Sequence, residues 1–135
     1  AITKKNPLKK KSHLNLESRI SLSKEIVSKE KKIVIKYFED KIRSTNTFNL
    51  LNFIKKKNQK TKLFFIIGAD NLVKYHKWKN WKKIPSIAKI VVFPRGKHSV
   101  KSINKIISKK LNKKDFICIN SKLINISSSL IRKFW

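Results

Sequence analysis

Cysteine, glycine, proline and methionine are all scarce or absent in this sequence. Its 135 residues include 1 Cys, 2 Gly, 3 Pro and 0 Met. One cysteine cannot form an internal disulfide, and Cys118 lies in the apolar run 116–119, where we expect a small core residue rather than a nucleophile or a metal ligand. Long apolar runs are also missing, because no stretch approaches the roughly 20 residues that cross a bilayer, and no signal-peptide pattern is present. We therefore expect a cytoplasmic protein with no membrane partner.

Acidic residues are few, and arginine is rarer still. The 7 Asp+Glu stand against 35 Lys+Arg, and the resulting net charge of +28 suggests by itself a nucleic-acid partner. Only four of these cations are arginine, the residue whose planar fork reads phosphates and bases. The lysines are spread through every segment together with Ile and Asn, so we attribute the excess to an AT-rich coding sequence. We expect no specific nucleic-acid partner, and a basic nucleic-acid-binding α/β protein stays an alternative.

Apolar patterning predicts helices and strands that alternate along the chain. Helical spacing is found in residues 15–29, from Thr47 to about residue 54, from about Asp70 to Tyr75, in residues 99–111, and from Ser127 or Ser128 toward Trp135. β-Branched or wholly apolar runs predict strands at 33–35, 63–67, 90–93 and 116–119, of which 63–67 should be a central strand buried on both faces. Because helices separate the strands, we expect an α/β fold of one domain, residues 1–135, with a parallel sheet and with ligands at the carboxyl ends of its strands.

Two of the predicted strands are followed by residues that suit a nucleotide. Asp70 comes directly after the strand 63–67, and its carboxylate can accept hydrogen bonds from a ribose hydroxyl pair, although Asp is equally common as a helix cap. Gly68 would let a ligand approach the backbone closely, but a tight strand-to-helix turn requires glycine just as often. Arg95 follows Pro94 at the end of the strand 90–93, a suitable position from which to hold a phosphate.

The sequence ends in a serine run closed by an arginine, Ile126-Ser127-Ser128-Ser129-Leu130-Ile131-Arg132. Free backbone N–H groups at a helix start, serine hydroxyls and Arg132 would face one point, an arrangement suited to phosphate oxygens. An ordinary serine cap with a solvated arginine explains the same run.

Other side chains give weaker indications. Trp78 and Trp81 are three residues apart, so both rings would lie on one helix face, either in the core or stacked on a flat aromatic ligand. The histidines, His13, His76 and His98, show no metal-ligand spacing, and we expect no metal site built by the protein.

From Asn6 to Arg132, the order and spacing of these segments resemble bacterial nicotinate-nucleotide adenylyltransferases of the nucleotidyltransferase superfamily. The resemblance is carried by residues 65–72 (FIIGADNL), 76–81 (HKWKNW), 91–95 (VVFPR) and 126–132 (ISSSLIR), the last close to the family's I-S-S-T-x-I-R. It implies a Rossmann-like fold, with a parallel sheet and flanking helices. The implied reaction joins nicotinate mononucleotide to the AMP part of ATP, giving deamido-NAD and pyrophosphate in NAD biosynthesis, with Mg²⁺ accompanying ATP. An enzyme for another acceptor, nicotinamide mononucleotide or phosphopantetheine, is the alternative within the superfamily.

The resemblance also implies a role for each matching residue. In an acceptor pocket, Trp78 would stack on the nicotinate ring, Thr47 would hold its carboxylate, and Asn6 and Arg95 would contact the mononucleotide phosphate. In a nucleotide pocket, Gly68 and Asp70 would line the ATP ribose, and Ser128, Ser129 and Arg132 would bind the triphosphate.

Two departures from the family pattern affect these expectations. The family's S-Y-T-x-D-T helix start is replaced here by 45–50 (TNTFNL), which keeps Thr47 but has Asn46 for tyrosine and Asn49 for aspartate. The family opens with a strand and loop of the form G-x-F-N-P-x-H-x-G-H, whose histidines neutralise charge on the ATP phosphates, and no such segment is present. We expect that residues 1–3 end a second strand, that the first strand and helix are missing, and that such a chain turns over slowly. No catalytic residue is assigned.

Overall fold

The computed structural model describes residues 1–4, 14–95, 98–110 and 112–121. The chain forms two compact units, Ala1–Ile54 and Lys55–Trp135, and each is described by itself. The expectation of a single domain over residues 1–135 stays a prediction. Within the described residues, no helix combines the length and the apolar composition needed to span a membrane.

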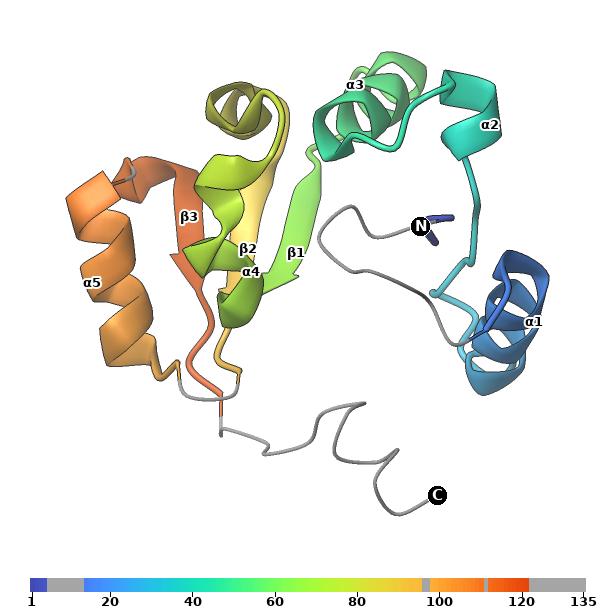
Figure 1. Cartoon of the computed structure of the whole chain (residues 1–135), viewed down its shortest axis with the longest axis horizontal. Helices are drawn as coiled ribbons and strands as arrows, with labels where there is room; N and C mark the ends of the chain where they lie inside the picture. The colour runs from blue at the N-terminus through green and yellow to red at the C-terminus, as the bar shows by residue number, and fades with distance from the viewer. Residues whose placement is uncertain (5–13, 96–97, 111, 122–135) are drawn as a thin grey trace. The chain divides into compact units, whose positions relative to one another are not determined.

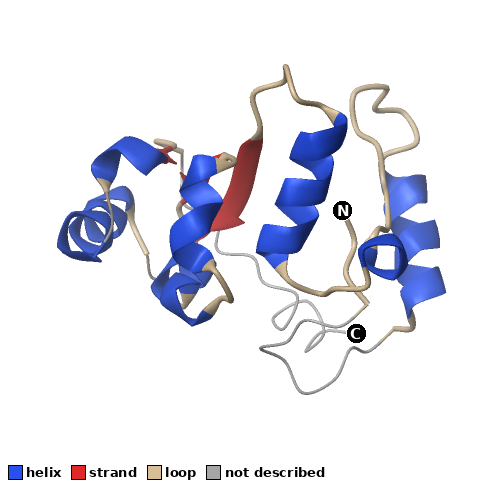
Figure 2. Cartoon of the chain, turned by 90° about the horizontal axis from the view of Figure 1, so that it is seen from above, coloured by secondary structure: helices blue, strands red, loops and turns tan. Residues whose placement is uncertain are grey.

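The regular structure of the first unit is helical (Figure 2). It contains α1 (Leu16–Ile26), α2 (Glu39–Ile42) and the start of α3 (Thr47–Lys57). Asn15 caps α1, because its side chain accepts a hydrogen bond of 2.8 Å from the Ser18 N–H. Around α3, Leu51 is buried, and the Phe38 and Phe53 rings lie 5.6 Å apart.

The strand expected at residues 33–35 is not formed. Ile33 and Val34 are 51% and 66% exposed, and the nearest pairing is an isolated parallel bridge between Ile2 and Tyr37. The Ile2 N–H donates to the Lys36 carbonyl at 2.9 Å. β-Branched residues favour a strand only where neighbours pair with it and cover its side chains. The one bridge places Ile2 beside Tyr37, but it does not extend back to residues 33–35.

The second unit holds the parallel sheet that the alternating pattern predicted (Figure 1). Its strands β1 (Phe64–Gly68), β2 (Lys89–Phe93) and β3 (Phe116–Cys118) lie in the order β1-β2-β3. The helices α4 (Ala69–Val73) and α5 (Val100–Lys110) contact each other as well as the sheet. Short 3₁₀ helices cover Tyr75–Lys77, Trp81–Ser86 and Lys113–Asp115. The core is made by fully buried side chains of β2 and α5, among them Ile90, Val92 and Ile103.

The expectation that residues 63–67 form a central strand buried on both faces is wrong for this sheet. β1 lies at one edge and pairs only with β2. Ile67 is 5% exposed, whereas Phe64 and Ile66 are 58% and 64% exposed. Alternate residues of a strand point to opposite faces, so the face that carries Phe64 and Ile66 lacks the cover that Ile67 receives.

Candidate functional site

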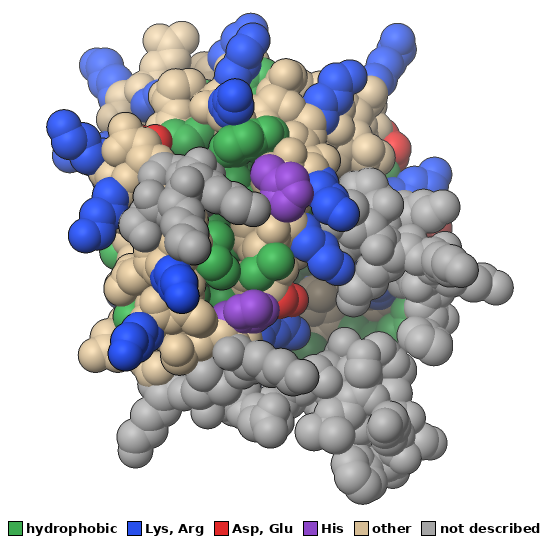
Figure 3. Space-filling model, turned by 60° about the vertical axis from the view of Figure 1, so that its left-hand side comes forward, with side chains coloured by type: hydrophobic (Ala, Val, Ile, Leu, Met, Phe, Trp, Pro, Cys, Tyr) green, Lys and Arg blue, Asp and Glu red, His purple; other side chains and the backbone are tan. Residues whose placement is uncertain are grey.

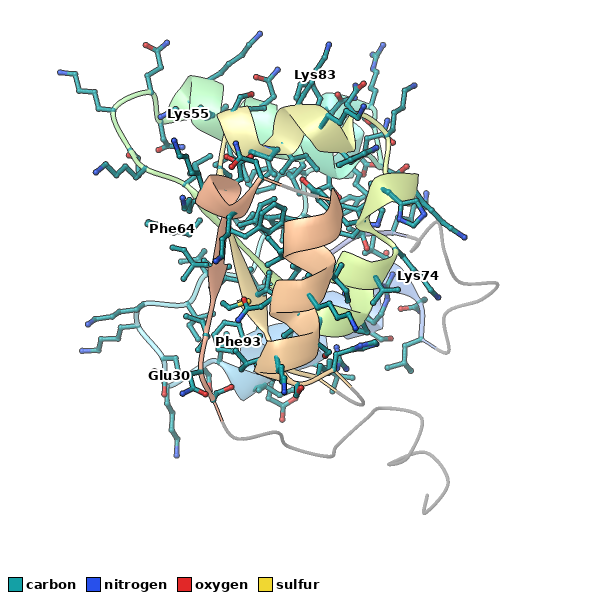
Figure 4. The ribbon with its side chains drawn as sticks, turned by 90° about the vertical axis from the view of Figure 1, so that its left-hand side faces the viewer. Glu30, Lys55, Phe64, Lys74, Lys83 and Phe93 are labelled. Atoms are coloured by element: carbon teal, nitrogen blue, oxygen red, sulfur yellow. The ribbon has the colours of Figure 1, made fainter. Side chains whose placement is uncertain are left out.

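The carboxyl ends of the three strands meet at one edge of the sheet, as parallel pairing requires. Gly68, the last residue of β1, is in register with Phe93, the last residue of β2. Val92 is in register with Cys118 at the end of β3. Phe64 and Phe93 therefore mark the amino and the carboxyl ends of the strands in Figure 4. This carboxyl edge is where open α/β sheets bind ligands.

Three of the predicted site residues come together at this edge. A Cβ atom added to Gly68 would lie 2.5 Å from Asp70 Oδ1 and 3.1 Å from Arg95 Cδ. The Asp70 and Arg95 side chains therefore lie over the bare Cα of Gly68, although Arg95 belongs to the loop after another strand. Both side chains are exposed, so their charged groups are open to a ligand.

The geometry removes one of the two interpretations of Gly68. Its backbone has φ −78° and ψ 155°, an extended conformation that any residue adopts, so the strand-to-helix turn does not require glycine. A side chain at this position would instead displace the Asp70 carboxylate and crowd the Arg95 side chain. Close approach of a ligand to this backbone stays a prediction.

Asp70 lies in the first turn of α4 but is not its N-cap, which is Gly68. No hydrogen bond to the Asp70 carboxylate is found from the residues that the structure describes. The negative charge of Asp70 in the first turn interacts favourably with the dipole of α4, and this interaction partly explains why an acid is tolerated at this position. The capping interpretation of Asp70 is therefore wrong, and its carboxylate is available to accept hydrogen bonds from a ligand.

Arg95 is joined to His98, a residue that the sequence did not single out for the site. The two residues form an isolated antiparallel bridge, in which the His98 N–H donates to the Arg95 carbonyl at 3.1 Å. His98 is half-buried and precedes α5. The sequence signals between β2 and His98 are Pro94 and Gly96, and neither indicates that His98 returns to the same edge.

Trp78 is partly buried in the core and partly accessible to solvent. Its ring centroid lies 5.9 Å from that of Phe65 and 5.6 Å from that of Tyr75, and the residue is half-buried. Trp81 contacts the same Tyr75 ring at 5.6 Å. The two tryptophans do not share a helix as expected, because Asn80 between them has φ 56° in the left-handed region. Instead, both tryptophan rings contact the Tyr75 ring.

Thr47 belongs to the first unit, where it is half-buried and begins α3. The turn before it is organised by Ser44, which sequence reasoning did not place in the site. Ser44 Oγ accepts hydrogen bonds from the Asn46 N–H at 3.2 Å and from Asn49 Nδ2 at 2.8 Å. Of the two asparagines that depart from the family's helix start, Asn46 takes part through its backbone N–H and Asn49 through its side chain. A hollow of about 560 Å³ lies beside this turn.

The other predicted site residues, Asn6, Ser128, Ser129 and Arg132, lie outside the described residues, as does the predicted closing helix. Cys118 is half-buried in β3, and burial raises the pKa of its thiol, in keeping with a packing role. Across the described ranges, no group of three or more His, Cys, Asp and Glu side chains could hold a metal ion.

Lysine and arginine side chains do not form one continuous patch on the face shown in Figure 3. They project at scattered points, with hydrophobic and uncharged surface between them. This distribution is what a compositional excess of lysine produces, and it does not by itself mark an interface.

Comparison with known proteins agrees with the fold. The family described as cytidylyltransferase-like matches residues 1–134. A protein of Pelagibacter ubique named "Probable nicotinate-nucleotide adenylyltransferase" is 41% identical over 133 residues, which cover 98% of this chain and 73% of the relative. One of the same name from Agrobacterium fabrum is 37% identical over 95 residues, and the matched part spans half of its length.

A solved structure shows the same fold. The Plasmodium falciparum nicotinic acid mononucleotide adenylyltransferase complexed with APC superimposes with a TM-score of 0.68 at 24% identity, covering 89% of this chain and 62% of that protein. At this identity the likeness concerns the fold, and it confirms the predicted Rossmann-like arrangement. The sequence match over nearly the whole chain goes further. The chain belongs to the cytidylyltransferase-like family, and its relatives there are the nicotinate-nucleotide adenylyltransferases.

Proposed function

We propose that this chain transfers the AMP part of ATP to nicotinate mononucleotide, giving deamido-NAD and pyrophosphate. The observation that carries the proposal is the convergence of Gly68, Asp70 and Arg95 at the carboxyl edge of a parallel sheet. It occurs in a chain 41% identical to a protein named for this activity. The proposal places the reaction in the cytoplasm, where ATP is made and used.

On the ATP side, Asp70 accepts hydrogen bonds from the ribose hydroxyls, and the bare backbone of Gly68 lets the sugar approach. The support is the Asp70 carboxylate, which is exposed and does not cap α4. Ser128, Ser129 and Arg132 bind the triphosphate in this proposal, on the strength of their match to the family motif.

On the acceptor side, Trp78 stacks on the nicotinate ring and Thr47 holds its carboxylate. Asn6 and Arg95 contact the mononucleotide phosphate. The support from geometry is greatest for Arg95, whose side chain lies over Gly68 together with Asp70. A guanidinium at that place would hold the acceptor phosphate close to the ATP sugar, which carries the α-phosphate.

The chemistry that follows is in-line attack. An oxygen of the mononucleotide phosphate forms a bond to the α-phosphorus of ATP as the bond to pyrophosphate breaks. Positioning of two anions and stabilisation of their charge are the main tasks of the protein in such a step. In this proposal Mg²⁺ accompanies ATP, coordinated by the phosphate oxygens, and offsets part of their negative charge.

Calorimetric titration of the purified chain with ATP and with three acceptors tests the proposal. The acceptors are nicotinate mononucleotide, nicotinamide mononucleotide and phosphopantetheine, and a coupled assay of pyrophosphate release follows each. We expect binding of ATP and a preference for nicotinate mononucleotide over the other two. Equal or stronger binding of another acceptor would move the assignment to that acceptor, and absence of ATP binding would overturn the proposal.

A further inference from the structure

The first unit contains a cavity of about 560 Å³, lined by Lys4, by residues of α2 and its neighbours, and by the turn before α3. Pockets that bind small molecules usually have volumes of about 300–1,000 Å³, so this cavity has room for a ligand. None of its lining residues has a role in the proposed reaction. We call it the α2 cavity.

The acids that line the α2 cavity offer little to a ligand. Asp40 Oδ1 accepts a hydrogen bond of 2.8 Å from the Tyr37 hydroxyl. Glu39 Oε2 accepts the Lys4 N–H at 2.8 Å, and Glu39 Oε1 is buried, so that a ligand cannot reach it. The carboxylate oxygens that could attract a cation are therefore mostly occupied or covered.

The hydrogen-bond donors that line the α2 cavity are uncommitted. Neither the Lys4 ammonium nor the Arg43 guanidinium forms a hydrogen bond or an ion pair with the residues that the structure describes. Ser44 Oγ accepts two hydrogen bonds, and its own hydrogen remains for a ligand. Thr45 is exposed and adds a second hydroxyl. Two cations and two hydroxyls around one cavity suit an anion.

The backbone of Arg43 gives a second reason to look for a ligand. It has φ 46° and ψ 39°, in the left-handed region, where glycine is favoured and a residue with a side chain costs free energy. Arg43 is the C-cap of α2, and its N–H donates to the Glu39 carbonyl, a hydrogen bond that glycine would make equally well. The end of the helix therefore does not explain an arginine at this position, which points to a task for the side chain.

The other cation of the cavity starts from a fixed backbone. The Lys4 N–H donates to Glu39 Oε2, and the Lys4 carbonyl accepts a hydrogen bond of 2.7 Å from Arg19 Nη2. These two hydrogen bonds hold the Lys4 backbone at the wall of the cavity before any ligand binds, which lowers the cost of ordering it on binding.

We infer that the α2 cavity binds a phosphorylated small molecule, with its phosphate held by Lys4 and Arg43 and by the hydroxyls of Ser44 and Thr45. A guanidinium binds two phosphate oxygens at once, and an ammonium can bind a third. The volume of the cavity leaves room for the group to which the phosphate is attached. The site is independent of the proposed function, because it uses none of the residues assigned to that reaction.

Titration of isotope-labelled protein with inorganic phosphate at constant ionic strength tests the site, with amide NMR as the readout. In the wild type, we expect the amides of Ser44, Thr45 and Asn46 to shift and to saturate. Arg43→Gly should raise the dissociation constant by about tenfold or more. Its unfolding temperature should equal or exceed that of the wild type, because glycine suits the left-handed backbone. Loss of binding would then not be a result of unfolding.

Lys41→Ala is the matched control. It removes a positive charge from the same helix, two residues from Arg43, and Lys41 does not line the cavity. We expect its affinity for phosphate to match that of the wild type. Equal losses of affinity in Lys41→Ala and Arg43→Gly would show that general lysine charge attracts the phosphate, and they would overturn the assigned site. Wild-type shifts that do not saturate, or that occur only in residues 55–135, would also overturn it.

Two further ligands test the chemical class. Acetate should produce much smaller shifts than phosphate at the same ionic strength, and equal saturable shifts would overturn the assignment to phosphate. Ribose 5-phosphate should bind more tightly than inorganic phosphate, because the cavity has room for the sugar, and an equal or weaker affinity would overturn the role of the cavity. The titrations contain neither ATP nor nicotinate mononucleotide, so failure of the proposed function would leave these results unchanged.

Discussion

Replacement of Gly68 by alanine is the most direct perturbation of the candidate site. The new methyl group would lie 2.5 Å from Asp70 Oδ1, so the carboxylate must move, and 3.1 Å from Arg95 Cδ, so that side chain must shift by a few tenths of an ångström. The backbone of Gly68, at φ −78° and ψ 155°, accepts alanine without strain. The substitution therefore displaces two site residues and leaves the strand-to-helix connection as it is.

The expected effect on stability is small. Gly→Ala at a compatible backbone position stabilises a protein by about 0.4–1 kcal/mol, because the unfolded chain loses freedom. Against this gain stands the cost of turning Asp70 to another rotamer and shifting the flexible end of Arg95. Both side chains are exposed and can move into solvent, so we expect the unfolding free energy to change by less than about 1 kcal/mol.

The expected effect on ATP binding is large. A hydrogen bond to a charged group contributes roughly 1.5–3 kcal/mol, so displacement of the Asp70 carboxylate from the ribose should raise the dissociation constant for ATP by about 10- to 150-fold. Calorimetric titration measures this constant, and chemical denaturation measures the stability of the same preparation. The signature of the proposed site is a large loss of affinity with little change in stability.

A double-mutant cycle assigns the loss to Asp70. Asp70→Ala removes the carboxylate that the new methyl group displaces, so Gly68→Ala should weaken ATP binding much less in the Asp70→Ala background than in the wild type. Residues that act through each other give such non-additive effects. Additive losses, or a Gly68→Ala protein that binds ATP like the wild type, would refute the reasoning that Gly68 is kept bare for the site.

Other perturbations test the remaining parts of the structure. Trp78→Ala should weaken nicotinate mononucleotide binding by about tenfold or more, since stacking contributes roughly 1–3 kcal/mol, and should weaken ATP binding much less. Equal losses of affinity for the two ligands, or the same loss in Trp81→Ala, would assign Trp78 to the core. Desolvation and the hydrogen bond to Asp40 raise the pKa of Tyr37 to about 12. The contribution of Tyr37 to stability is therefore complete below pH 10 and is lost between pH 10 and about 12. An absorbance titration of tyrosinate in the wild type and in Tyr37→Phe should show this change. Ile103→Ala, at a fully buried position of α5, should cost about 2–5 kcal/mol in a denaturant titration. Association with DNA or RNA, if driven only by lysine charge, should disappear at moderate salt, and sequence-specific binding that survives would favour the nucleic-acid alternative.

The elements of the second unit could be predicted from the sequence because each has its own apolar signal. The run around Ile90 is apolar throughout and forms a buried strand, and the helical spacing that includes Ile103 forms a helix whose inner side chains are fully buried. The two wrong predictions, a strand at 33–35 and burial of 63–67 on both faces, have a common cause. Ile33 and Phe64 both lie in apolar runs, and whether such a run is paired and covered depends on neighbours that the run itself does not specify.

The site was predictable in its residue types but not in its contacts. Gly68 and Asp70 follow one strand and Arg95 follows another, and each is conspicuous in its own segment. That Arg95 reaches over Gly68 depends on the register that aligns Gly68 with Phe93, a long-range feature without a local signal. The hydrogen bonds from Arg19 to the Thr3 and Lys4 carbonyls are of the same kind, because backbone carbonyls are present at every residue and give no signal in the sequence.

The scarcity of arginine takes on a physical meaning once the contacts are known. At positions that need only a positive charge, a compositional bias toward lysine can replace arginine by lysine. We therefore expect the remaining arginines at positions that need the planar guanidinium. Arg19 binds two successive carbonyls through two nitrogens of one planar group, and Arg95 lies over Gly68 beside Asp70. Arg43, exposed at the end of α2, makes no side-chain hydrogen bond of this kind with the described residues. Among the arginines that the structure describes, Arg19 is the one whose hydrogen bonds use the planar fork, so a need for that geometry accounts for one of the few arginines in a chain with a net charge of +28.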